Sequence, residues 1–170
     1  MDVDSNGLKG SLPTEIGLLS ELQKLDISVN TLTGTLPSQL GALLSLEVLY
    51  LYFNELTGPI PSQLGEISTL QHLYLDGNTL TGILPSQLGI MSSLQELGLS
   101  SNELTGTLPS QLGQLSSLNR LSLNDNKMIG TVPSELGEIP TLKTLDLRFN
   151  ALTGTIPLEI DQTQVDVSFP

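Results

Sequence analysis

The only imidazole of the chain, His72, lies among its tyrosines: Tyr50 and Tyr52 precede it and Tyr74 follows it. An imidazole can act as a general base, but nucleophilic catalysis also needs a hydroxyl or thiol held beside it. The chain has no Cys and no G-x-S-x-G motif. A histidine beside tyrosines without a nucleophile is typical of a contact residue, so we expect a protein that is not an enzyme.

Metal and cofactor sites are equally poorly supported. The segment from Asp2 to Gly7 matches the opening of a calcium-binding loop, but Pro13 stands at the twelfth position, where the loop needs a bidentate glutamate. The absence of cysteine excludes disulfides and Cys-based zinc sites. Glu135 and Glu138 fall in a predicted solvated turn. The sequence therefore predicts no metal and no cofactor.

The charge balance limits the class of partner. The chain of 170 residues carries 18 acidic and 6 basic residues, a formal charge of -12. Such a surface repels phosphate polymers and anionic lipid, so we expect no nucleic-acid partner. No apolar run approaches about 18 residues, and the first residues do not resemble a signal peptide. We therefore expect no direct membrane insertion, and a monomer.

A strict period of 24 residues organises the whole chain. It is carried by three columns of residues: Asn6, Asn30, Asn54, Asn78, Asn102, Asn126 and Asn150; Gly10, Gly34, Gly58, Gly82, Gly106, Gly130 and Gly154; Pro13, Pro37, Pro61, Pro85, Pro109, Pro133 and Pro157. No insertion interrupts these seven units, which is the pattern of a repeat protein. We therefore predict a single domain over residues 1–170, with a frayed terminal strand from about residue 161.

Each unit predicts a strand, a turn and a short helix. The L-x-L stretch has period two and forms a strand with its leucines inward, and the P-x-x-L-G segment forms one turn of 3₁₀ or α helix. One unit cannot bury its own leucines, so neighbouring units must stack and align their strands into one parallel sheet. We expect the Asn column to satisfy buried backbone groups as a ladder from coil to coil.

The repeat resembles that of leucine-rich repeat proteins. The residues that carry the resemblance are Leu46, Leu49, Leu51, Asn54, Leu56, Thr57, Gly58, Ile60, Pro61, Leu64, Gly65 and Ile67. The L-T-G-x-[LI]-P portion is similar to the plant-type subclass found in receptor-kinase ectodomains and polygalacturonase-inhibiting proteins. The resemblance implies an α/β solenoid, a right-handed superhelix with a concave parallel sheet and convex short turns. It also implies an extracellular or cell-surface location and a protein or peptide ligand.

Two departures from this subclass are visible. Its extracellular members usually have Cys-containing caps, which this chain lacks, and Met1 and Val3 already stand in strand register. Asp161 replaces the expected Gly and Asp166 the expected first Leu. These departures predict a fragment of a larger protein or an unusual member of the subclass.

Ligand contacts are expected at the variable strand positions, because the consensus residues are used for folding. Three columns point out of the concave face: Lys24, Val48, His72, Glu96, Arg120 and Thr144; Asp26, Tyr50, Tyr74, Gly98, Ser122 and Asp146; Ser28, Tyr52, Asp76, Ser100, Asn124 and Arg148. Tyrosine gives a large contact area at low entropic cost. The predicted ligand-binding residues are Tyr50, Tyr52, His72, Tyr74, Glu96, Arg120 and Arg148.

Several alternatives stay open at this stage. The aromatic residues also suit exposed strand positions, and the mixed charges around Arg120 and Arg148 also suit a solvated surface. We expect Phe53 to be partly buried, because Phe149 occupies the equivalent place. Rows of threonine that include Thr57 and Thr81 resemble an ice-binding surface, so carbohydrate or ice binding is an alternative function. A spacer within a larger receptor-like protein is another.

Overall fold

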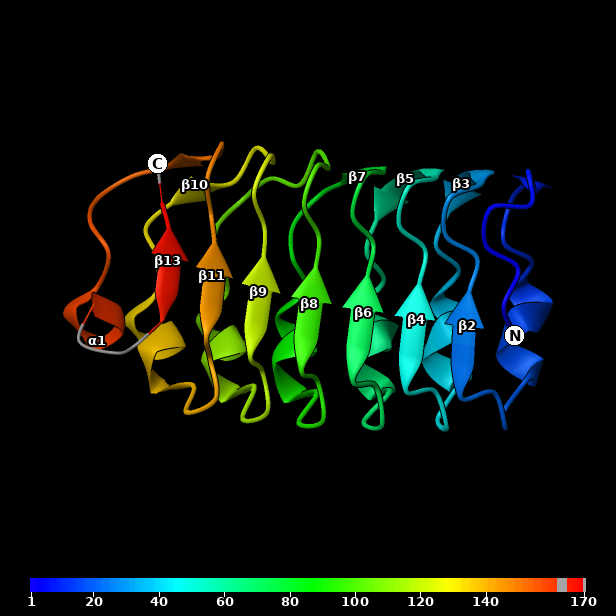
Figure 1. Cartoon of the computed structure of the whole chain (residues 1–170), viewed down its shortest axis with the longest axis horizontal. Coiled ribbons are helices and arrows are strands. Elements are labelled where there is room, and N and C mark those ends of the chain that lie inside the picture. The colour runs from blue at the N-terminus through cyan, green and yellow to red at the C-terminus, as the bar shows by residue number, and fades with distance from the viewer. Residues whose placement is uncertain (162–164, 170) are drawn as a thin grey trace.

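The computed structural model describes residues 1–161 and 165–169, and it shows a stack of similar coils. The strands of one side form a seven-stranded parallel sheet in the order β13-β11-β9-β8-β6-β4-β2 (Figure 1). Its strands are β2 (Lys24–Asp26), β4 (Val48–Tyr50), β6 (His72–Tyr74), β8 (Glu96–Gly98), β9 (Arg120–Ser122), β11 (Thr144–Asp146) and β13 (Asp166–Ser168). The predicted parallel sheet is confirmed. Its outward side is the concave face of the solenoid.

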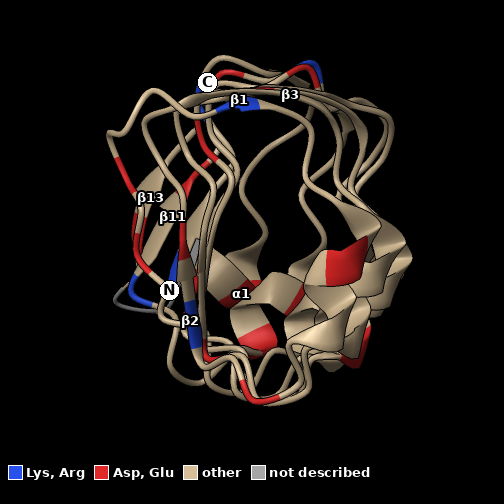
Figure 2. Cartoon of the chain, turned by 90° about the vertical axis from the view of Figure 1, so that its right-hand side faces the viewer, with Lys and Arg blue, Asp and Glu red and all other residues tan. Residues whose placement is uncertain are grey.

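The opposite side of each coil is a short helix (Figure 2). Six are 3₁₀ helices: η1 (Thr14–Leu18), η2 (Ser38–Ala42), η3 (Ser62–Glu66), η4 (Ser86–Ile90), η5 (Ser110–Gln114) and η6 (Ser134–Glu138). The last coil has α1 (Leu158–Asp161) instead. Pro37 precedes η2 with φ of -71°, the value that its ring imposes. Gly41 lies within the same helix, at a point where a Cβ atom would collide with the Gln63 carbonyl of the next coil.

A second set of strands closes the third side of the coil. One sheet has the order β1-β3-β5-β7 and a separate pair joins β10 to β12. The strands are β1 (Lys9–Gly10), β3 (Thr31–Thr35), β5 (Glu55–Pro59), β7 (Thr79–Thr81), β10 (Ile129–Gly130) and β12 (Ala151–Leu152). Figure 2 shows β1 and β3 along one edge of the coil, between the main sheet and the helical turns.

The interior is a continuous column of leucines. Leu49, Leu73 and Leu97 align on neighbouring strands and are fully buried. Each alternates along its strand with residues that point outward, because successive side chains of a strand point to opposite faces. The sheet therefore presents one outward residue on each side of every buried leucine, which fixes where the variable residues lie.

The asparagine column joins each coil to the one before it. Asn78 accepts a hydrogen bond from the Leu56 amide at 3.0 Å, and its Nδ2 donates to the carbonyls of Leu51, Leu75 and Asp76 at 3.0, 3.0 and 3.3 Å. Asn54, Asn102 and Asn126 repeat this pattern in their own coils. The predicted ladder is confirmed, and it holds the chain where each coil leaves the main sheet.

Candidate functional site

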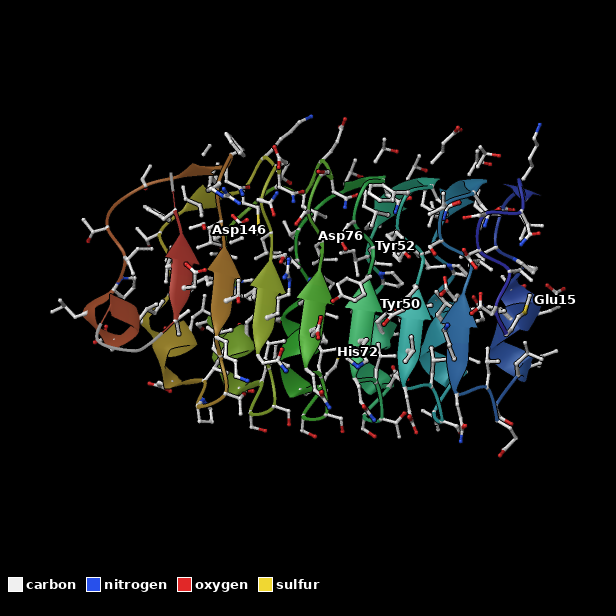
Figure 3. The ribbon with its side chains drawn as sticks, in the orientation of Figure 1. Glu15, Tyr50, Tyr52, His72, Asp76 and Asp146 are labelled. Atoms are coloured by element: carbon white, nitrogen blue, oxygen red, sulfur yellow. The ribbon has the colours of Figure 1, made fainter. Side chains whose placement is uncertain are left out.

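Three tyrosines form one cluster on the outward side of β4 and β6. Tyr50 and Tyr74 stand opposite each other in the parallel register, with ring centroids 5.2 Å apart. Tyr52, two residues after Tyr50, lies 6.0 Å from the Tyr50 ring and 6.5 Å from the Tyr74 ring. All three are half-buried, and Figure 3 shows Tyr50, Tyr52 and His72 close together on the sheet. Aromatic rings at these separations attract one another, which stabilises the arrangement of the cluster.

Phe53 extends the cluster, and the expectation that it is partly buried is wrong. Its side chain is 60% exposed, and Phe149 in the equivalent place is 68% exposed. Its φ of 52° is shared by the same position of other coils, such as Ser101 at 54°. This backbone turn points the ring away from the core and over Gly77, where a Cβ atom would collide with it. The Phe53 and Tyr52 rings meet edge to face at 5.6 Å.

A carboxylate fixes one edge of the cluster. The Tyr74 hydroxyl donates a hydrogen bond to Glu96 Oε2, and His72 Nδ1 lies 3.9 Å from Glu96 Oε1. Burial raises the pKa of Tyr74, and the hydrogen bond to Glu96 raises it further. Burial also raises the pKa of Tyr50, with the Glu96 charge as a second cause. Both phenols therefore stay protonated at neutral pH; the Tyr74 proton is donated to Glu96, whereas the Tyr50 hydroxyl can donate to a ligand.

A depression of ≈ 280 Å³ opens beside the tyrosines. Its lining residues are Tyr52, Phe53, Tyr74, Asp76, Ser100, Arg120 and Ser122. Gly98 continues the row of Tyr50 and Tyr74 onto β8, and a Cβ atom there would collide with the Tyr74 ring and with Asp76 Oδ2. The Tyr74 ring and the Asp76 carboxylate therefore occupy the space that a side chain at residue 98 would take, and the glycine lets both pack against β8. The sequence places Gly98 in the outward column but does not show this close packing.

Asp76 is the charged group of this depression that the candidate site omitted. It is half-buried, and its Oδ1 accepts a hydrogen bond from the Ser100 amide at 2.9 Å. Burial raises the pKa of this carboxyl, while the Ser100 amide and the nearby Arg120 charge work in the opposite direction. The sequence places Asp76 in the third outward column, next to Tyr52, and this position could have identified it as a site residue.

The two predicted arginines lie in different surroundings. Arg120 is exposed at the edge of the depression, and its Nε donates to Ser122 Oγ at 3.1 Å. Arg148 lies on a more distant coil and pairs with Asp146 at 2.6 Å. That pairing holds the pKa of Asp146 below its usual value. The structure thus brings Tyr50, Tyr52, His72, Tyr74, Glu96 and Arg120 together on adjoining strands, and it leaves Arg148 apart.

Two other kinds of site, a metal-binding cluster and a larger hollow, are less well supported by the described residues. Within residues 1–161 and 165–169, no group of three or more His, Asp or Glu side chains is placed to hold a metal ion. A larger hollow of ≈ 850 Å³ near Asn119 and Lys143 is lined in part by Val165, which directly follows the undescribed residues 162–164. The aromatic depression is therefore the candidate site.

Comparison with protein-family models identifies the repeat. The model described as "Leucine rich repeat" matches residues 20–80 and 92–152, which is most of the chain. The chain belongs to the leucine-rich repeat family. No curated protein matches it by sequence.

The solved structures similar to this leucine-rich repeat protein include plant receptor ectodomains. The ectodomain of the Arabidopsis receptor kinase HAESA, solved with a peptide hormone ligand, is 32% identical with a TM-score of 0.93, over 98% of this chain and 28% of that one. The plant peptide hormone receptor RGFR1, in complex with RGF2, is 34% identical with a TM-score of 0.82, over 95% and 30%. The chain thus spans about a third of these receptors' length.

A third similar structure is that of a protein with a different function. A plant ice-binding protein is 31% identical with a TM-score of 0.88, over 99% of this chain and 54% of that one. The leucine-rich repeat fold alone therefore does not decide the ligand. Among the residues that the structure describes, no helix has the length and hydrophobicity needed to cross a membrane.

Proposed function

We propose that the concave face is a non-enzymatic recognition surface for a protein or peptide, centred on Tyr50, Tyr52, Tyr74 and His72. The observation that carries the proposal is the gathering of all three tyrosines of the chain, with Phe53, on two neighbouring coils. The leucines beneath them are fully buried, so the rings stand on a rigid support. Binding then costs little ordering entropy at these residues.

The class of partner and the location rest on the similar receptors. HAESA and RGFR1 were solved with peptide hormones, and this chain shares their coil geometry over almost its whole length. We infer that its partner is a protein or peptide and that the site works outside the cell. Glu96 and Arg120 border the cluster and take part as polar contacts at its edge.

A peptide selection tests the proposal. A random dodecapeptide library is panned on the immobilised protein, and the enriched sequences are measured by calorimetry against a variant with Tyr50, Tyr52 and Tyr74 changed to Ala. We expect affinity to fall at least about tenfold, because aromatic anchors dominate such interfaces. The matched control changes Ser68, Ser92 and Ser116 to Ala, which truncates three exposed side chains away from the concave columns. Equal affinity for both variants would contradict the proposal and favour a spacer role.

A second candidate function rests on the second sheet. Exposed threonines recur along this side of the coils in two rows of the repeat: Thr33, Thr57, Thr81, Thr105 and Thr153; Thr35, Thr107, Thr131 and Thr155. The hydroxyls of Thr57 and Thr105 donate to the carbonyls of Gly34 and Gly82 at 3.3 and 3.2 Å. Ile129 interrupts the first row, and Pro59 and Ile83 interrupt the second. Parallel strands repeat at about 4.8 Å, so the rows form an interrupted array of methyl and hydroxyl groups. With the ice-binding neighbour, this array supports binding to ice.

Freezing behaviour separates the two candidates. If the rows bind ice, the protein produces thermal hysteresis, and Thr81→Lys abolishes it by placing a flexible charge in the middle of the array. The tyrosine triple variant serves as the control and keeps full hysteresis. Absence of hysteresis and of ice-recrystallisation inhibition in the unaltered protein would remove this candidate.

A further inference from the structure

The depression beside Gly98 combines an aromatic wall with a half-buried carboxylate. Tyr52, Phe53 and Tyr74 form the wall, and Asp76 contributes the acid. We propose that this depression receives a basic side chain, lysine or arginine, from the peptide or protein partner. The inference rests on the proposed function and specifies which residue of the partner anchors it.

A cation of the chain itself lies beside the aromatic cluster. Lys24 Nζ is paired with Asp2 and Asp26 at 2.8 and 3.3 Å, and it also lies 5.9 Å from the centroid of the Tyr50 ring. Aromatic faces attract ammonium and guanidinium groups within about 6 Å of the centroid. Tyr52 meets Phe53 and Tyr74 edge to face, and all three residues line the depression. The wall that a ligand meets is therefore of the kind that attracts positive charge.

Asp76 provides the complementary charge at the base of this wall. Its Oδ1 is bound by the Ser100 amide, and its Oδ2 lies over Gly98, at the place that a side chain would otherwise fill. Burial raises the pKa of Asp76, so its negative charge is only partly compensated within the protein. An incoming cation would supply that compensation, and Glu96 beside Tyr74 adds to the attraction. The net charge of -12 favours the approach of a basic partner.

Arg120 makes the sign of the ligand charge testable. It borders the same depression, but it is exposed and its Nε is bound to Ser122. A basic ligand is attracted by Asp76 and repelled by Arg120, whereas an acidic ligand would depend on Arg120. Neutral, similarly shaped variants of the two residues must therefore act in opposite directions.

The tyrosines supply a specific reporter for the experiment. The chain has three Tyr and no Trp, so its tyrosine fluorescence comes entirely from the cluster. The probes are acetylated and amidated Gly/Ser heptapeptides with a central arginine, citrulline or glutamate. They are titrated into the full chain and into Asp76→Asn, Arg120→Gln and Gly98→Ala. The matched control is Asp166→Asn, which removes one exposed charge at the distant edge of the same sheet.

We expect the arginine peptide to bind more tightly than the citrulline and glutamate peptides. Asp76→Asn should weaken it about tenfold, since it removes the charge partner of a partly desolvated cation. Gly98→Ala should weaken it similarly by displacing the Tyr74 ring and the Asp76 carboxylate, Arg120→Gln should tighten it, and Asp166→Asn should leave it unchanged. Circular dichroism confirms that each variant is folded.

Three results would overturn the inference. Tighter binding of the glutamate peptide, lost with Arg120→Gln, would assign the depression to an acidic anchor. An equal loss with Asp76→Asn and Asp166→Asn would mean that only overall charge matters. A cluster that binds selected peptides but does not respond to the arginine peptide would refute the basic anchor and leave the proposed function intact.

Discussion

The buried asparagine row and the outward columns of the concave face are built on the same repeat but behave in opposite ways. Asn54, Asn78 and Asn102 make the same hydrogen bonds in successive coils. The outward column beside them changes from Tyr52 to Asp76, and these two side chains make different contacts: the ring packs on other rings, and the carboxylate accepts from the Ser100 amide. A residue type that recurs in every coil serves the stacking that every coil needs. A residue type that is confined to two adjacent coils serves a role that is local to those coils, such as recognition of a ligand.

This difference also separates stability from recognition. The leucines and asparagines account for the core and its polar ladder, and the same coil forms whether its outward residue is Tyr74 or Gly98. The concave face is therefore free to vary without loss of the fold. The substitutions that test this separation differ in the loss of free energy of unfolding that we expect from each.

The largest effect is expected for Asn78→Ala. The change leaves the Leu56 amide and the carbonyls that Asn78 binds without their partner in the middle of the stack. Buried unsatisfied groups are costly, so the free energy of unfolding should fall by about 3 kcal/mol. Urea denaturation followed by circular dichroism measures it.

The first coil supplies the matched control for this change. Asn6 belongs to the same column, but it is exposed and its Nδ2 donates to the nearby Asp4 carbonyl. Asn6→Ala should therefore destabilise much less. Equal losses at the two positions would show that the ladder does not derive its strength from burial.

Tyr74→Phe is expected to have a much smaller effect on stability. It removes the hydroxyl that donates to Glu96 and keeps the ring. The bond lies on the half-exposed face, so we expect a loss of about 0.5 kcal/mol. Tyr50→Phe is the control, because no hydrogen bond of the Tyr50 hydroxyl to a described residue is present. A loss as large as that of Asn78→Ala would mean that the concave face also maintains the fold.

Much of the fold was predictable because every coil must bury its leucines and pair its strands with the neighbouring coils in the same way. Seven recurrences of Asn, Gly and Pro fix the strand register and the start of each turn, so the main sheet, the 3₁₀ turns and the ladder follow from the period. Thr hydrogen bonding in the second sheet follows from the same regularity.

The candidate site was predictable only in outline. The outward columns placed the tyrosines on neighbouring strands, because position in a strand is set by the repeat. The form of the depression depends on the packing of Tyr74 and Asp76 over Gly98 and on the half-burial of Asp76, which the sequence pattern does not determine. Phe53 was wrongly assigned because a shared column was taken for burial, whereas the positive φ there turns the side chain outward.

Two acids of the outward columns should give the smallest effects, with opposite signs. The pKa of Asp76 is raised by burial, so the folded state binds its proton more strongly, and ionising it opposes folding above that pKa. Asp76→Asn should raise the unfolding temperature slightly at pH 7, and the gain should shrink as the pH falls through the raised pKa. The pKa of Asp146 is lowered by Arg148. Its stabilisation is present above the ordinary carboxyl pKa, so Asp146→Asn should destabilise at pH 7 and not at low pH.

Thermal unfolding of the two variants and the parent, measured stepwise from pH 7 down to about pH 2, gives both slopes. Each change should stay below about 0.5 kcal/mol, because half-exposed charges are screened by solvent. Opposite slopes would mean that Asp146 supports the fold while Asp76 is kept at some cost to it. A carboxylate that lowers the stability of the fold inside an aromatic depression is explained if it binds a ligand. Destabilisation by Asp76→Asn at pH 7 would instead assign this residue, like the asparagines, to holding the coils together.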